Sequence, residues 1–205
     1  MRENQHIVKY HGIITPSDRF KLNGHKGGVI WFTGLPASGK STIAHLLEAE
    51  LYKLGIRSYV LDGDNIRNGL NSDLGFSREY RKENIRRVVE VARLFSDAGL
   101  VVMCAFITPF EEDRIYIRER LKDNNYVEIY IKCSIMVCEM RDKKGFYKKA
   151  REGIIRDYTG VSSPYEEPDK SHLVIDTENS SIEESVSEIL RFLREKRFLE
   201  LEKNE

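Results

Sequence analysis

The sequence has little of several features that mark particular classes of protein. Its 205 residues include only three cysteines, Cys104, Cys133 and Cys138, and the formal net charge at pH 7 is zero. An odd, small set of cysteines is not a disulfide framework and favours a reducing compartment. No cysteine–histidine spacing typical of a metal site accompanies them. The balanced charge gives no sign that nucleic acid or an anionic membrane is a partner.

Long hydrophobic runs are also lacking. No run approaches the ~20 apolar residues that span a membrane, and the opening residues MRENQHIVKY contain no apolar core of a signal peptide. We therefore expect a cytoplasmic protein that binds neither membrane nor nucleic acid. The guanine-reading pattern NKxD is absent too, which argues against a Ras-like switch.

Short apolar runs alternate with segments of helical spacing along most of the chain. The runs expected to be strands are 28–34, 56–64, 99–107, 126–132 and 172–177. Amphipathic helices are expected between them, and a last one begins near Ser181. This alternation predicts an α/β fold of three layers, α/β/α, with a central parallel sheet.

The chain divides into three parts by composition. Residues 1–26 are polar, with "TPSD" and "NGHKGG" as turn signals, and are expected to be an N-terminal extension. Residues 27–200 form the expected domain. Within it, the basic segment at about 141–168 lacks a sustained apolar period, and residues 201–205 are a polar tail.

The stretch "GLPASGKST" follows the first expected strand and opens a helix, as a P-loop does. Its backbone N–H groups and the helix N-terminus suit phosphate, so we predict a P-loop NTPase fold that binds ATP. Lys40 is expected to reach the β- and γ-phosphates, and Ser41 to ligate Mg²⁺. The predicted ATP-binding residues of this stretch are Gly34, Leu35, Pro36, Ala37, Ser38, Gly39, Lys40, Ser41 and Thr42.

Two carboxylates follow the second expected strand, in "LDGDNIRNGL". Because ligands gather at the carboxyl ends of parallel strands, Asp62 is expected beside the phosphates, where it orients or deprotonates an acceptor hydroxyl. An Asp-Gly turn is the structural alternative for Asp62. Asp64 is read either as a functional group or as the N-cap of the next helix.

The following segments are basic and contain one aromatic residue within a polar loop. Arg67 and Arg81 flank a loop over the same edge of the sheet, where they suit an anionic acceptor. Phe76 is read as a ring that stacks on the acceptor or as a contact with the core. The basic segment at 141–168 lies where nucleotide kinases have a mobile lid that closes over the reactants.

Several longer blocks are more specific than the P-loop. They are "KGGVIWFTG", "DGDNIRNGLNSDLGFS", "RKENIRRVVEVARLFSDAGLVV", "FITPF" and "RDKKGFYKKAREGIIRDYTGVSSPYEEP". In these blocks the sequence resembles the adenylyl-sulfate kinase (APS kinase) family. The resemblance implies transfer of the γ-phosphate of MgATP to the 3′-hydroxyl of adenosine 5′-phosphosulfate (APS), giving 3′-phosphoadenylyl sulfate (PAPS) and ADP in sulfate assimilation.

The resemblance also implies roles for individual residues. Asp62 resembles the carboxylate that faces the 3′-hydroxyl, with Lys40 and Thr108 as the other catalytic residues. Arg141 and Thr177 resemble neighbours of the ATP adenine. The implied APS contacts are Asp64, Arg67, Phe76, Arg81, Asn84, Ile107, Thr108, Lys144, Tyr158 and Thr159. Among these, Phe76 and Tyr158 resemble an aromatic pair that sandwiches the APS adenine.

The sequence departs from the family pattern at three places. "ITPF" replaces the usual "ISPY", so Thr108 stands where a serine is often described as a phosphorylated intermediate. Because direct in-line transfer needs no such intermediate, we expect Thr108 to position the acceptor. Tyr158 replaces a phenylalanine, and "GLPASGKS" replaces "GLSGSGKS".

Other functions compete with this interpretation. They are a kinase for another hydroxylated metabolite, a nucleotide-binding module without turnover, and a nucleic-acid kinase, which the neutral charge disfavours. The family resemblance suggests a homodimer, and an association with an ATP sulfurylase stays open.

Overall fold

A computed structural model of the chain describes residue 8 and residues 12–200. Its centre is a five-stranded sheet in the order β2-β3-β1-β4-β5, in which all neighbouring strands are parallel. The strands are β1 (Gly28–Thr33), β2 (Ser58–Asp62), β3 (Val101–Ala105), β4 (Tyr126–Lys132) and β5 (Leu173–Asp176). The expected parallel sheet is therefore confirmed. Because all the strands run in the same direction, their carboxyl ends lie on the same side of the sheet.

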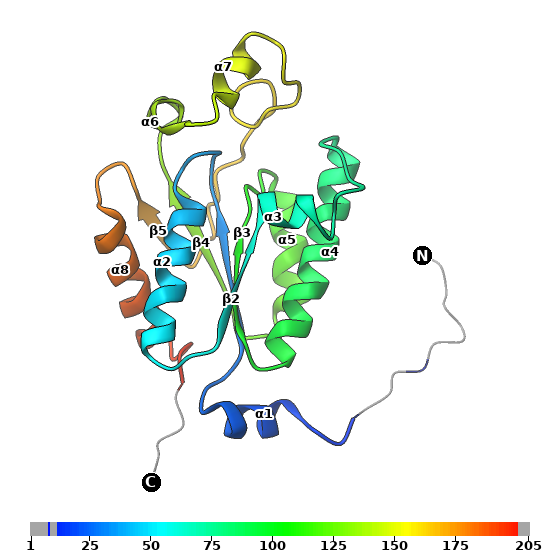
Figure 1. Ribbon diagram of the computed structural model, residues 1–205, viewed down its shortest axis with the longest axis vertical. Helices are drawn as coiled ribbons and strands as arrows, with labels where there is room; N and C mark the ends of the chain where they lie inside the picture. Colours follow the sequence, from blue (N-terminus) through cyan, green and yellow to red (C-terminus); the bar gives the residue numbers. More distant parts are fainter. Residues whose placement is uncertain (1–7, 9–11, 201–205) are drawn as a thin grey trace.

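Helices cover both faces of the sheet (Figure 1). On one face lie α2 (Lys40–Lys53) and α8 (Ile182–Glu195), and on the other lie α4 (Arg78–Asp97) and α5 (Glu111–Leu121). Successive side chains of a strand point to opposite faces, so β1 serves both layers. Ile30 and Phe32 pack with α2 and α8, while Val29 and Trp31 pack with α4 and α5. The three-layer prediction is thus confirmed.

The extension contains a helix that the turn signals did not predict. Residues Pro16–Asn23 form α1, which lies near the amino ends of the strands, on the side opposite the carboxyl ends (Figure 1). The interpretation of "TPSD" as a turn was wrong because the same letters make a capping box. Thr15 Oγ1 accepts a hydrogen bond from the Asp18 backbone N–H, and Asp18 Oδ2 accepts one from the Thr15 N–H at 2.8 Å.

The basic segment stands above the carboxyl ends of the strands, where a lid was expected (Figure 1). It follows α6 (Ile135–Arg141) and contains the short helix α7 (Phe146–Arg151), which the lack of apolar period did not predict. A second short helix, α3 (Gly63–Asn68), follows β2 directly. No helix in residues 12–200 is long and apolar enough to cross a membrane.

The core between the sheet and α2 should dominate stability. Leu47 is fully buried there, whereas Leu94 on α4 is 65% exposed. We expect Leu47→Ala to lower the free energy of unfolding by about 2–5 kcal/mol, because it leaves a cavity. The same substitution at Leu94 should change it by less than about 0.5 kcal/mol. Urea unfolding of both variants checks this, and equal losses would contradict the assigned core.

Candidate active site

The phosphate loop between β1 and α2 depends on two glycines. Gly34 and Gly39 have φ angles of 153° and 104°, and a Cβ on Gly34 would lie 2.5 Å from the Ile131 carbonyl oxygen. Gly39 is also the N-cap of α2 and has no side chain to cap it. The first N–H groups of α2 therefore stay available for an anion, as the sequence pattern predicts.

Lys40 is buried inside this loop. Its Nζ donates hydrogen bonds to the carbonyl oxygens of Gly34 and Leu35, at 3.0 and 2.7 Å. Burial lowers the pKa of Lys40 to about 8, although Cys138, Asp62 and Asp64 act in the opposite direction. The hydrogen-bond partners of the ammonium in the loop are thus all neutral. A phosphate would be its first anionic hydrogen-bond partner.

Asp62 joins the loop to the second strand. Ser41 Oγ donates a hydrogen bond to Asp62 Oδ2 at 2.5 Å, and the Asp64 backbone N–H donates to Asp62 Oδ1 at 2.9 Å. Asp62 is therefore the N-cap of α3. The alternative that Asp64 caps this helix was wrong, because Asp64 occupies its first turn and its side chain is exposed.

Residues of the basic segment at 141–168 contact α3 and α4, which carry residues predicted to bind the acceptor. Lys144 Nζ forms an ion pair with Asp64, and this hydrogen bond raises the pKa of Lys144. Arg81 donates to Thr159 Oγ1 at 3.0 Å and to the Asp157 carbonyl. The structure thus pairs Lys144 with Asp64 and Arg81 with Thr159, four residues that the family resemblance assigned to one site.

The two aromatic residues predicted to sandwich an adenine have different partners here. Phe76 is 62% exposed, and the Arg67 guanidinium lies 4.4 Å from its ring centroid. The ring of Tyr158 meets the ring of Tyr147 edge-on at 5.0 Å. An exposed ring beside an arginine has no role in the core, so the core-contact alternative for Phe76 loses its support.

Of the two predicted neighbours of the ATP adenine, Thr177 contacts the phosphate loop and Arg141 contacts Thr177. Arg141 donates to the Thr177 carbonyl at 2.7 Å, and Thr177 Oγ1 donates to the Ser38 carbonyl at 2.9 Å. Ile107 is next to the loop as well, because its carbonyl accepts a hydrogen bond from the Gly34 N–H at 3.3 Å. Thr177 and Ile107 therefore contact the phosphate loop directly and Arg141 is joined to it through Thr177, although the three residues come from distant segments of the chain.

Some residues of this region were not predicted from the sequence. Trp31 donates to Thr108 Oγ1 at 2.9 Å, Asn71 donates to Asn84 Oδ1 at 3.0 Å, and the Tyr147 hydroxyl donates to the Pro36 carbonyl at 3.0 Å. Trp31 was read only as part of an apolar strand. A tryptophan has one polar atom that needs a partner when buried, and that requirement was the available signal.

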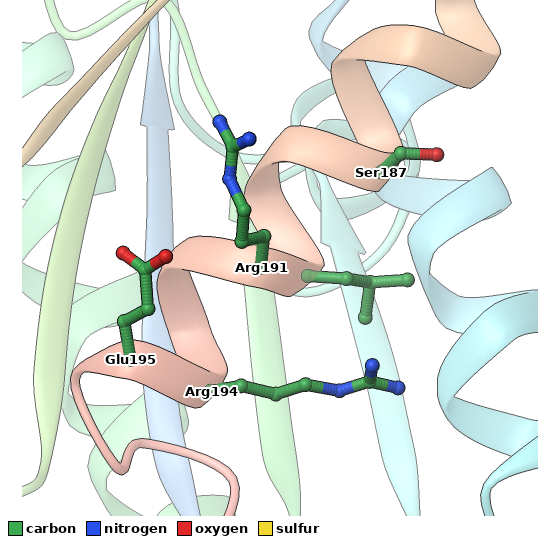
Figure 2. Close-up of a pocket in the computed structure, with 5 residues that line it drawn as sticks. Ser187, Arg191, Arg194 and Glu195 are labelled. Atoms are coloured by element: carbon green, nitrogen blue, oxygen red, sulfur yellow. The ribbon is translucent and has the colours of Figure 1, made fainter.

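A separate groove of about 330 Å³ lies on the outer side of α8 (Figure 2). Ser187, Leu190, Arg191, Arg194 and Glu195 line it. None of them belongs to the predicted site. The candidate site near β1 and β2 is therefore defined by its hydrogen bonds and charges, and this groove is not part of it.

The chain matches the family model described as adenylylsulphate kinase over residues 26–176. It is 54% identical to an adenylyl-sulfate kinase of Thermodesulfovibrio yellowstonii, over 95% of this chain and 98% of that relative. The chain belongs to the adenylylsulphate kinase family. The predictions of family, fold class and kinase activity are therefore confirmed.

Solved structures agree with this assignment. The APS kinase of Mycobacterium tuberculosis in complex with AMPPNP and APS is 43% identical and gives a TM-score of 0.80, covering 82% of this chain and 98% of that one. A hexameric APS kinase from Thiobacillus denitrificans is 29% identical with a TM-score of 0.67. That match covers 89% of this chain and 32% of the other.

The low pKa of Lys40 predicts a pH dependence. Lys40 is protonated at pH 7 and loses its charge as the pH rises through about 8, and the charge favours phosphate binding. We expect the Kd of MgATP to rise about tenfold between pH 7 and pH 9.5, with proton uptake on binding above pH 8. Calorimetric titration across this range measures both quantities.

Two substitutions on α2 control this experiment. Lys40→Met should bind MgATP weakly, with no comparable pH dependence. Lys53→Met removes an exposed lysine at the other end of the helix and should behave as the unmodified chain. A Kd that stays constant to pH 9.5 in the unmodified chain would refute the assigned pKa.

Proposed function

We propose that the chain transfers the γ-phosphate of MgATP to the 3′-hydroxyl of APS, giving PAPS and ADP in sulfate activation. One observation carries this proposal: Lys40, Ser41 and Asp62 form one cluster at the carboxyl ends of β1 and β2, beneath a basic lid that contacts Asp64 and Arg81. A kinase needs a phosphate loop, a carboxylate for the acceptor and a cover against water in one place.

The donor half of the site is assigned to the loop at residues 34–42. Its N–H groups and Lys40 would hold the phosphates, with Lys40 exchanging two carbonyl partners for phosphate oxygens. Arg141 and Thr177 would border the adenine, since Thr177 is hydrogen-bonded to the same loop through Ser38. Direct contact between charged donors and the γ-phosphate stabilises the charge that spreads over its oxygens during transfer.

The oxygens of Ser41 and Asp62 fit Mg²⁺. A hydroxyl and a carboxylate supply hard oxygen ligands of the kind this ion prefers, and here their oxygens lie 2.5 Å apart. We assign Ser41 as the protein ligand and Asp62 as support. When bound, the ion supplies positive charge that neutralises the β- and γ-phosphates.

The acceptor half is assigned to residues from several segments of the chain. Asp62 would orient the 3′-hydroxyl and accept its proton, and Arg67 and Arg81 would hold the anionic phosphosulfate. Phe76 and Tyr158 would clamp the adenine after the lid moves. The remaining assigned contacts are Asp64, Asn84, Ile107, Thr108, Lys144 and Thr159.

The test is ADP release from MgATP in the presence of single acceptors. A panel of APS, adenosine 5′-monophosphate, gluconate and a short oligonucleotide separates the substrate classes. We expect turnover with APS alone. Turnover only with gluconate or the oligonucleotide would replace the proposed acceptor, and ATP binding without turnover with any acceptor would favour a regulatory module.

We expect Asp62→Asn to lower kcat by about 10² to 10⁴, because an amide cannot accept the proton of the hydroxyl. The amide oxygen can still cap α3, so the fold should change little, and the Kd of MgATP should rise by a much smaller factor than the fall in kcat. Steady-state kinetics with APS and a nucleotide titration measure these quantities. A kcat near that of the unmodified chain would remove Asp62 from the proposed role.

Phe76→Ala should raise the KM for APS by about tenfold or more, because a stacked ring contributes about 1–3 kcal/mol per base. The KM for MgATP should stay within about twofold. Tyr80→Ala is the matched control, since Tyr80 is another exposed ring (47%) on the following helix. Equal effects of both substitutions would contradict stacking by Phe76.

We further propose a homodimer in the cytoplasm. The hexameric relative does not decide this point, since only 32% of that chain is covered. Light scattering of the purified chain tests the dimer. Mixing it with an ATP sulfurylase in the same measurement tests the association that the sequence left open.

A further inference from the structure

Trp31 is the only tryptophan of the chain, and it lies on β1, in the strand that leads into the phosphate loop. Its side chain is fully buried, and its ring is stacked on Phe106 at 5.5 Å between centroids. Its indole N–H donates a hydrogen bond to Thr108 Oγ1 at 2.9 Å. The one polar atom of this core residue is therefore directed at a residue of the proposed acceptor site.

Thr108 has an unusual backbone conformation. Its φ angle is 45°, in the left-handed region that β-branched residues rarely adopt. Such a conformation persists only where the surroundings fix it. The Thr108 carbonyl accepts a hydrogen bond from Arg114 Nη1 at 3.0 Å, and the Thr33 hydroxyl donates to the preceding carbonyl of Ile107 at 2.7 Å.

Arg114 is itself held in place. Its side chain is 1% exposed, and its Nε donates a hydrogen bond to Glu111 Oε2 at 2.9 Å on the same helix. An arginine that is buried and paired in this way has little freedom to move. The backbone of Thr108 is thus fixed by Arg114, and its side chain by Trp31.

The hydrogen bond from Trp31 determines what the Thr108 hydroxyl can do. A hydroxyl has one proton to donate and two lone pairs that accept. Because one lone pair accepts the indole N–H, the hydroxyl proton must be directed away from Trp31. The hydroxyl is thereby left to donate its proton to a partner other than Trp31.

We propose that Trp31 is a positioning residue for the acceptor. Its indole N–H orients the Thr108 hydroxyl so that this hydroxyl donates a hydrogen bond to the acceptor molecule. The inference rests on the proposed function, in which Thr108 lines the acceptor site. A role in core packing alone would require the ring of Trp31 but not its N–H group.

A double-mutant cycle separates the two roles. Trp31→Phe keeps an aromatic ring and removes the N–H group, and Thr108→Val keeps the shape and removes the hydroxyl. We expect each to lower kcat/KM for APS by about 3- to 10-fold, the size of one hydrogen bond. The double variant should be no worse than the more impaired single variant, because both remove the same interaction.

Three further measurements control this cycle. The Kd of MgATP should stay within about twofold in all variants. Thr108→Ser, which keeps the hydroxyl, should retain most of the activity. Phe106→Leu removes the stacked ring but keeps the N–H group, and it should not reproduce the loss for APS. Additive effects in the cycle, or an equal loss in Phe106→Leu, would overturn the proposal.

A spectroscopic readout does not depend on activity. With a single tryptophan, ¹⁵N labelling gives one indole N–H resonance. We expect Thr108→Val to move this resonance upfield, and APS added with a non-hydrolysable ATP analogue to shift it in the unmodified chain. A resonance that neither Thr108→Val nor APS moves would overturn the proposal.

The two proposals can be told apart. Absence of ADP release with APS in the unmodified chain would refute the proposed function. Normal turnover with APS combined with an additive cycle would refute only the role of Trp31.

Discussion

The hydrogen bond from Ser41 to Asp62 is the interaction on which the rest of the site depends. It joins the first turn of α2 to the end of β2, and so it fixes where a phosphate group and an acceptor hydroxyl can meet. Parallel pairing makes this contact possible, because β1 and β2 both pair with β3 in register and end at one edge. The same carboxylate caps α3, so the start of the acceptor segment is set by the group proposed to serve the acceptor.

The residues proposed to bind substrates are paired with one another or with backbone in this structure. Lys144 pairs with Asp64, and Arg81 bonds to the lid backbone and to Thr159. Under the proposed function, substrate binding replaces these contacts. The cost is small for the Lys144–Asp64 pair, since both side chains are more than half exposed and an exposed ion pair contributes about 0–1 kcal/mol. Under the proposed function, Lys144 can therefore exchange its contact with Asp64 for one with an anionic acceptor at little cost.

Much of the fold followed from the sequence, and the exceptions have physical reasons. The strands were predictable because each is a short apolar run between turn signals, and the phosphate loop because its glycines recur at fixed spacing. α1 was missed because Thr15 and Asp18 serve equally well in a turn or a capping box. Asp62 rather than Asp64 caps α3, a difference of two residues that composition does not resolve. The partner of Trp31 depends on long-range contacts, since Thr108 is 77 residues away.

Lys40 and Trp31 illustrate how a buried polar group can serve a site at the carboxyl ends of the strands. Both are buried, and each has found partners that satisfy it, as burial requires. Their partners differ in kind. Lys40 is a charge bonded to neutral carbonyls, so burial lowers its pKa to about 8 and an anion would be a better partner. Trp31 is neutral and already has a matched acceptor, so it gains nothing from a substrate directly and acts through the hydroxyl that it orients. Binding would therefore displace the contacts of Lys40, whereas those of Trp31 would persist.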